Sequence, residues 1–157
     1  MGHDYRVTVR WERGDAVFTD GRYSRAHVWA FDGIEIPGSS APGSVRVPLS
    51  REDAVDPEEA LTASASSCHM LFFLDFARRA GLTVDRYEDA AVAEMGPNEA
   101  GKLYVTRVTL NPDVTFSGAK APTPEEFAQL HHRAHEECYI ANSLRGEVVV
   151  QPTFSVI

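Results

Sequence analysis

Residues 56–80 read DPEEALTASASSCHMLFFLDFARRA, and this stretch decides the fold. Asp56 is a good N-cap residue, Pro57 stands at the first helical position, and two glutamates follow in the first turn, where the backbone dipole favours acids. The pattern runs to Ala80, and Gly81 is suited to the left-handed conformation that ends helices. The stretch therefore predicts one long helix, whose small central residues let another backbone come close.

The same start signal occurs a second time, at Thr123-Pro124-Glu125-Glu126. In the helix that follows, five residues recur at i, i+3, i+4, i+7 and i+11, which places them on one helical face. These residues are Phe127, Leu130, His131, Ala134 and Cys138. Because this face ends on a cysteine, Cys138 is expected to point inward.

Several other stretches alternate in polarity or are rich in β-branched residues, and we predict them as strands. They are residues 5–12, 16–18 and 24–31 before the first helix, 83–95 and 102–116 between the helices, and 147–156 at the end. Residues 33–48, rich in proline, glycine and serine, are expected to form a loop. This order of elements predicts a single α+β domain over residues 1–157, with a curved antiparallel sheet around central helices.

The charge and hydrophobicity of the chain exclude some classes of function. The 157 residues carry a formal net charge of −8 at pH 7, with 43% hydrophobic and 24% charged residues, the balance of a soluble globular domain. An acidic chain without a basic stripe argues against nucleic acid as a partner. No run reaches the roughly 18 uninterrupted apolar residues of a membrane span, and the first residues lack a secretion signal. We therefore expect a cytoplasmic protein in a reducing compartment.

The chain has two cysteines, Cys68 and Cys138. In a reducing compartment, two thiols that meet in the fold are more often a cycling redox pair than a permanent bridge. Burial raises the pKa of a thiol, so a reactive Cys68 needs a cation beside it. The candidates precede the first helix: Arg22, Arg25, Arg46 and Arg51. Arg25 is the first choice because it lies on a predicted strand beside an apolar run.

Peroxide chemistry suits such a pair. A peroxide oxidises a thiolate to a sulfenic acid, and a second thiol converts this to a disulfide before irreversible oxidation occurs. Cys138 is the available second thiol. The helix around Cys68 offers an apolar lining that fits an alkyl or aryl substrate better than hydrogen peroxide: Leu71, Phe72, Phe73 and Phe76.

Two other interpretations stay open at this point. Free cysteines are among the most buried residue types, so composition alone favours Cys68 and Cys138 as small core residues. Alternatively, His131, His135 and Cys138 lie at i, i+4 and i+7, and with Cys68 or His69 as a fourth ligand they would suit zinc. That set lacks the paired C-x-x-C of structural zinc sites.

The chain resembles the OsmC/Ohr family of thiol-dependent peroxidases, which reduce organic hydroperoxides. The resemblance is carried by DPEE at 56–59, whose Glu58 precedes Cys68 of SSCHM by ten residues, and by AHEEC at 134–138 followed by NSL at 142–144. The segments IPGSS at 36–40 and YRVTVRW at 5–11 are also similar to the OsmC-like branch. The similarity thus spans nearly the whole chain.

The resemblance implies an OsmC-like fold, curved sheets wrapped around two central helices, in an intertwined homodimer with its active sites at the subunit interface. It implies a peroxidase of oxidative or osmotic stress defence, without metal or other cofactor. Cys68 is then the peroxidatic thiol and Cys138 the resolving thiol. Glu58 matches the glutamate that pairs with the catalytic arginine, for which Arg25 is expected and Arg22 is the competitor.

Helix geometry limits the role of that glutamate. Ten residues of continuous helix rise about 15 Å, so Glu58 cannot touch Cys68 on the same helix. Either the helix breaks between them, or Glu58 acts through its arginine or across the dimer. The resemblance also implies a dithiol reductant, which is a lipoylated protein for Ohr relatives. A non-catalytic redox sensor or small-ligand binding protein on the same fold is the alternative function.

Overall fold

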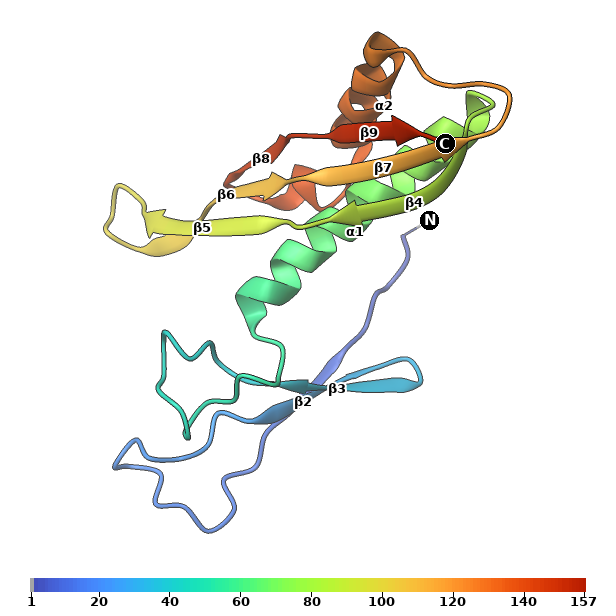
Figure 1. Ribbon diagram of the computed structural model, residues 1–157. Coiled ribbons are helices and arrows are strands. Elements are labelled where there is room, and N and C mark those ends of the chain that lie inside the picture. The colour runs from blue at the N-terminus through green and yellow to red at the C-terminus, as the bar shows by residue number, and fades with distance from the viewer. Residues whose placement is uncertain (1) are drawn as a thin grey trace. The chain divides into compact units, whose positions relative to one another are not determined.

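The computed structural model of the chain describes residues 2–157 (Figure 1). It divides into two compact units, which meet in the sequence between Ala60 and Leu61. The long helix α1, Pro57–Arg79, begins in the first unit and continues into the second. The single domain over residues 1–157 stays a prediction.

The first unit contains a three-stranded antiparallel sheet in the order β1-β2-β3. Its strands are β1 (Thr8–Arg10), β2 (His27–Phe31) and β3 (Ile34–Gly38). The expected strand over 5–12 is thus confirmed only at its centre, and residues 16–18 form no strand. The loop predicted from residue 33 is wrong at its start, because Gly33 adopts φ +78° in a tight turn that returns the chain along β2 as β3.

The second unit holds two further three-stranded sheets. One has the order β4-β7-β9, with β4 (Thr83–Asp89), β7 (Pro112–Ser117) and β9 (Thr153–Val156). The other has the order β5-β6-β8, with β5 (Val92–Pro97), β6 (Leu103–Leu110) and β8 (Glu147–Val150). Within this unit α2 (Pro124–Glu137) and the later part of α1 lie on the same side of the strands (Figure 1).

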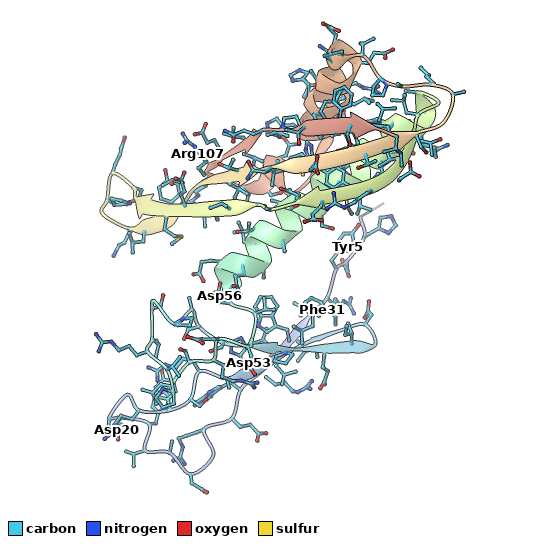
Figure 2. The ribbon with its side chains drawn as sticks, viewed as in Figure 1. Tyr5, Asp20, Phe31, Asp53, Asp56 and Arg107 are labelled. Atoms are coloured by element: carbon cyan, nitrogen blue, oxygen red, sulfur yellow. The ribbon has the colours of Figure 1, made fainter. Side chains whose placement is uncertain are left out.

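The α+β class is confirmed, but two of the strand pairs are parallel. β4–β7 and β5–β6 pair antiparallel as expected, whereas β6–β8 and β7–β9 are parallel. The chain passes through α2 between β7 and β8, and a helical crossover returns it in the same direction. In the β5-β6-β8 sheet, Arg107 on β6 forms ion pairs with Glu147 on β8 at 2.6 Å and with Glu94 on β5 at 3.8 Å (Figure 2).

Both predicted helix starts are confirmed as capping boxes. Before α1, the Glu59 N–H donates to the Asp56 carboxylate at 2.8 Å, and the Asp56 N–H donates back to Glu59 at 3.1 Å. Thr123 and Glu126 exchange the same two bonds at the start of α2, at 3.1 and 2.9 Å. Each start therefore satisfies two backbone donors that the helix itself leaves unpaired. α1 ends at Arg79, and Gly81 has φ +77°.

The main core lies between α1, α2 and β7. Its buried residues are Phe73, Phe76, Ala77, Leu82, Val114, Phe116, Phe127, Leu130 and Ala134. The apolar face predicted for α2 is confirmed, since every member of the i, i+3, i+4, i+7 and i+11 series is buried. Among residues 2–157, α1 is the one helix whose length and mean hydropathy of 1.2 meet the test for a membrane span, a test that soluble core helices also pass.

Candidate active site

Cys68 lies half-buried in α1, at the wall of a cavity of about 470 Å³ in the second unit. Most of the lining comes from one face of that helix, together with the residue after Cys138: Ser64, Ser67, Leu71, Phe72, Asp75 and Tyr139. A thiol at this position is open to a small molecule that enters the cavity.

Cys138 follows the last residue of α2 and is only 1% exposed. Its pKa is raised to about 11, chiefly because burial penalises the thiolate. The Ala141 N–H, which donates to Sγ at 3.4 Å, acts in the opposite direction, and the hydrogen bond with the Cys68 side chain raises the pKa further. Cys138 is therefore a protonated thiol at neutral pH, and the Cys68 side chain is close enough to contribute to its raised pKa.

The lining expected around Cys68 is correct in part. Leu71 and Phe72 line the cavity, whereas Phe73 and Phe76 are buried in the core, so their assignment to the pocket was wrong. Phe73 and Phe76 lie on the side of α1 that faces the core. Tyr139, whose ring meets Phe72 edge to face at 5.1 Å, was not predicted from the sequence. Its position directly after Cys138 was the available signal.

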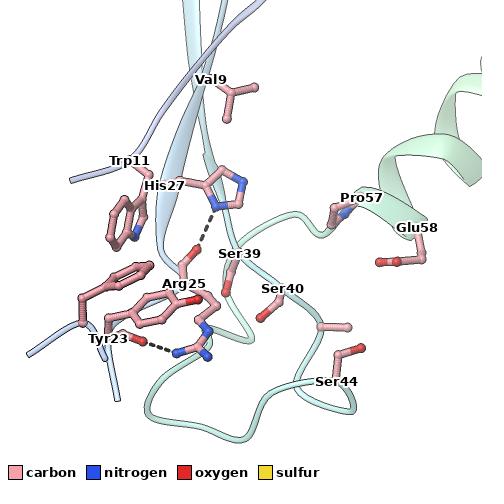
Figure 3. A pocket seen from close by; sticks show the side chains of 12 residues that line it. Val9, Trp11, Tyr23, Arg25, His27, Ser39, Ser40, Ser44, Pro57 and Glu58 are labelled. Carbon is pink, nitrogen blue, oxygen red and sulfur yellow. Dashed lines mark hydrogen bonds between the residues drawn. The ribbon is translucent and has the colours of Figure 1, made fainter. Parts of the chain in front are cut away.

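Arg25 and Glu58 line a second cavity, of about 570 Å³, which belongs to the first unit (Figure 3). Arg22 is not among its lining residues, so of the two competing arginines only Arg25 shares a cavity with the glutamate. Arg51 is held elsewhere by a two-pronged bond to Asp53, at 2.9 and 2.8 Å. Asp53 lies in the loop before α1 (Figure 2).

Backbone carbonyls and an aromatic ring fix the Arg25 side chain. Its Nη1 donates to the carbonyls of Gly21, at 2.8 Å, and Tyr23, and the guanidinium lies 3.8 Å from the centre of the Tyr23 ring (Figure 3). Arg25 precedes β2, so its expected place on a strand was wrong by two residues. The same wall carries a cluster in which Trp11, Phe18 and Tyr23 contact one another at 4.7–5.9 Å between ring centres.

His27 orders the strand end beside Arg25. Its Nδ1–H donates to the Arg25 carbonyl at 2.7 Å, and its Nε2 accepts from the Trp29 indole N–H at 2.7 Å. These two bonds require the neutral tautomer with the proton on Nδ1. Gly38 is tightly packed against this pair, because a Cβ there would lie 2.5 Å from the imidazole. The backbone that carries Arg25 is therefore fixed by its neighbours.

The helix between Glu58 and Cys68 does not break. α1 is continuous from Pro57 to Arg79, which removes the first of the alternatives for how the glutamate acts. Action through the arginine, or across a dimer, remains.

The zinc alternative is not supported. Among residues 2–157, no group of three or more His, Cys, Asp and Glu side chains is arranged to hold a metal ion. Instead, Nε2 of His69 and Nδ1 of His131 are hydrogen-bonded at 2.9 Å. Burial lowers the pKa of His69 to about 4 and that of His131 to about 3, so the pair is neutral at pH 7.

Comparison with known proteins gives family and fold. A family model described as OsmC-like protein matches residues 50–153. An OsmC-like protein of unknown function from Vibrio cholerae is 48% identical, with a TM-score of 0.95 over 97% of this chain and 100% of that chain. An organic hydroperoxide resistance protein from Elizabethkingia anophelis is 20% identical, with a TM-score of 0.65 over both entire chains.

OhrB of Bacillus subtilis, another organic hydroperoxide resistance protein, is 18% identical with a TM-score of 0.63 over 98% of each chain. At these low identities the similarity to the hydroperoxide resistance proteins shows a shared fold. No curated protein matches the chain.

Proposed function

We propose, because this chain belongs to the OsmC-like family, that it is a thiol-dependent peroxidase that reduces organic hydroperoxides to alcohols. The observation that carries the proposal is the pair of neighbouring thiols, one at a cavity wall and one buried behind it. The shared fold with organic hydroperoxide resistance proteins supports the same chemistry.

The reaction uses both thiols in sequence. The Cys68 thiolate attacks the distal oxygen of the hydroperoxide, the O–O bond breaks, and the leaving alkoxide takes up a proton to become the alcohol. Sulfur is oxidised to the sulfenic acid. The Cys138 sulfur then attacks the Cys68 sulfur, and the displaced hydroxide leaves as water with the proton from Cys138. A dithiol, for instance a lipoylated protein, reopens the disulfide by two exchange steps.

Arg25 supplies the positive charge that stabilises the Cys68 thiolate, and Glu58 orients that arginine. Support comes from their shared cavity and from the fixed guanidinium, since a preorganised charge costs no reordering during reaction. The raised pKa of Cys138 fits the resolving role, because a protonated buried thiol does not compete for the peroxide.

The protein acts as a homodimer in the cytoplasm. Several large apolar side chains are exposed on the single chain, among them Val9 at 60%, Leu71 at 61% and Leu103 at 71%. Such surfaces are covered in stable oligomers. A dimer also offers the route by which Arg25 and Glu58 of one subunit serve a thiol of the other.

The substrate is an organic hydroperoxide rather than hydrogen peroxide. Leu71, Phe72 and Tyr139 give the cavity at Cys68 a mainly apolar wall that stabilises an alkyl or aryl group by its burial. Hydrogen peroxide gains nothing from such a wall.

Steady-state consumption of an organic hydroperoxide in the presence of a dithiol tests the proposal. Cys68→Ser should abolish consumption, whereas Cys138→Ser should complete a single turnover and then accumulate over-oxidised Cys68. Ser155→Ala, exposed on β9 and lining neither cavity, is the control and should stay active. Full turnover by Cys68→Ser would refute the mechanism. Disulfide formation without turnover would identify a redox sensor instead.

A further inference from the structure

The two thiols sit on different elements of the second unit, Cys68 within α1 and Cys138 at the end of α2. A disulfide requires sulfur atoms about 2.05 Å apart and Cα atoms about 4.4–6.8 Å apart. The rotation of one helix against the other therefore decides whether the bond can close.

A buried hydrogen bond joins the two helices beside the thiols. Nε2 of His69 on α1 lies 2.9 Å from Nδ1 of His131 on α2, and these side chains are 1% and 3% exposed. The His131 ring lies nearly flat on Phe73 at 4.2 Å and meets Phe127 edge to face at 4.6 Å. The imidazoles are thus fixed by packing as well as by their bond.

The position of the bond relates it to both sulfurs. His69 follows Cys68 directly, so it shares the backbone that carries the peroxidatic thiol. His131 precedes Cys138 by seven residues, which is two helical turns on one face, with a rise of about 10 Å. Rotation of either helix about its axis would break this hydrogen bond and would at the same time move the two thiols apart.

Two apolar side chains in place of His69 and His131 would fill the core without leaving buried polar atoms unpaired. His69 Nδ1 and His131 Nε2 are both buried without a hydrogen-bond partner in the described part of the chain. A neutral pair uses one of its two N–H groups in the shared bond, so the other is left unsatisfied, which costs stability. Packing alone does not explain two histidines here, whereas a directional bond does.

We propose that His69 and His131 are positioning residues, whose hydrogen bond holds α1 and α2 in the rotation at which Cys68 and Cys138 face each other and thereby speeds disulfide closure. The inference rests on the proposed function, in which Cys138 attacks oxidised Cys68. It assigns the pair to the second chemical step and not to the attack on peroxide.

The test separates the two steps in reduced protein given one equivalent of an organic hydroperoxide. Peroxide loss reports the first step, and loss of free thiol or trapping of the sulfenic acid by a diketone reports closure. His131→Leu should slow closure about tenfold or more, because small misplacements of reacting atoms cost large factors in rate, and should slow the first step far less. His132→Leu, exposed on the next position of α2, is the control and should change neither.

Two polar variants supply the rescue. Asn at position 131 places an amide where Nδ1 stands, whereas Gln places it one bond further out. His131→Asn should recover most of the closure rate and His131→Gln should not, and this comparison decides the question even when the leucine variant fails to fold. If the pair were merely structural, the melting temperature would follow the size of the side chain at position 131. The closure rate would then not distinguish His131→Asn from His131→Gln.

Oxidation by diamide keeps the inference separate from the proposed function. Diamide takes up one thiolate as an adduct, and the second thiol displaces the reduced hydrazine as the disulfide forms, so no peroxide is needed. If the wild-type protein ignores hydroperoxides but His131→Leu slows closure by diamide, the peroxidase proposal fails and the positioning role stands. Closure by His131→Leu at the wild-type rate with both oxidants would overturn the positioning role.

Discussion

At the scale of single residues, the two thiols differ in access, and the pKa of Cys138 is raised by burial. Cys68 faces a cavity, whereas Cys138 is buried with a pKa of about 11. At pH 8 a thiol with that pKa is only about 0.1% thiolate, and the thiolate is the form that alkylates.

We therefore predict that iodoacetamide at pH 8 modifies Cys68 at least about tenfold faster than Cys138 in the reduced, folded protein. Peptide mapping by mass spectrometry after timed quenching measures both rates. In denaturant the two rates should converge, which serves as the control. Equal rates in the folded protein would show that Cys138 is not held as a buried thiol.

The histidine pair makes stability depend on pH in a defined direction. Burial lowers the pKa values of His69 and His131 from 6.5 to about 4 and about 3, so the unfolded chain binds protons more readily than the folded one. Well above pH 6.5 both imidazoles are neutral in the folded and the unfolded chain, so the lowered pKa values do not change the free energy of unfolding. As the pH falls below 6.5, each ring should cost about 1.4 kcal/mol per pH unit until its folded pKa is reached.

Urea unfolding at pH 7 and pH 5 measures this effect. The wild-type protein should lose about 2–4 kcal/mol more between these pH values than the double variant His69→Leu/His131→Leu, which has no buried imidazole to keep neutral. His132→Leu removes an exposed imidazole and should behave as the wild type. Identical losses in the wild type and the double variant would contradict the assignment.

The candidate residues of the site could be named at this scale, and its walls could be predicted only in part. The two cysteines, Arg25 and Glu58 were named from types, spacing and resemblance, and their proposed roles await experiment. The His69–His131 bond joins residues 62 positions apart. Nothing in the spacing along one helix indicates such a contact, because it depends on how two helices pack.

At the scale of elements, the chain before β8 leaves no room for a side chain. A Cβ at Gly146 would lie 2.2 Å from the Val105 carbonyl oxygen and 2.7 Å from that of Thr106, both on β6. β8 pairs with β6 from the next residue onward, so any outward shift at this point disturbs the parallel ladder.

Gly146→Ala should therefore destabilise the protein by about 2 kcal/mol or more, in the range of overpacking and lost ladder bonds. The free energy of unfolding in urea measures the loss. Gly43→Ala is the matched control, because a Cβ at Gly43 meets nothing within 4 Å and should change stability little. A Gly146→Ala protein as stable as that control would show that β8 does not approach β6 this closely.

Short sequence signals correctly predicted the helix starts, which depend on residues close together in the chain. The capping sequences at residues 56 and 123 fix both helix starts because the cap bonds join residues three apart. β3 was missed because Pro37 and Gly38 at its end, and the proline, glycine and serine residues that follow, resemble a loop, and its strand character comes from pairing with β2. The parallel pairs were missed because strand direction is set by the crossover through α2, and residues 147–156 carry no sign of it.

At the scale of the whole molecule, the proposed dimer would decide which subunit supplies the charge beside Cys68. We predict a homodimer in which Arg25 of one subunit serves Cys68 of the other. Mixed dimers of Cys68→Ser and Arg25→Ala chains test this, because each parent is inactive in the proposal. A cross-subunit site should restore up to about half the wild-type activity per mixed dimer, since one of its two sites is complete.

Sites formed within single chains would give mixed dimers with no activity, and sedimentation as a monomer would remove the dimer altogether. Mixed dimers of Arg22→Ala with Cys68→Ser are the matched control. They should also be half active, but here the Arg22→Ala parent alone should already be fully active, which separates the two arginines.

The central claim is that Cys68 and Cys138 are neighbours that an organic hydroperoxide joins. The most direct measurement is to treat the reduced protein with one equivalent of an organic hydroperoxide and map its cysteines by mass spectrometry under non-reducing conditions. We predict one equivalent of alcohol and a peptide pair linked through Cys68 and Cys138 of the same chain. Consumption of the peroxide with both thiols still open to alkylation would contradict the account.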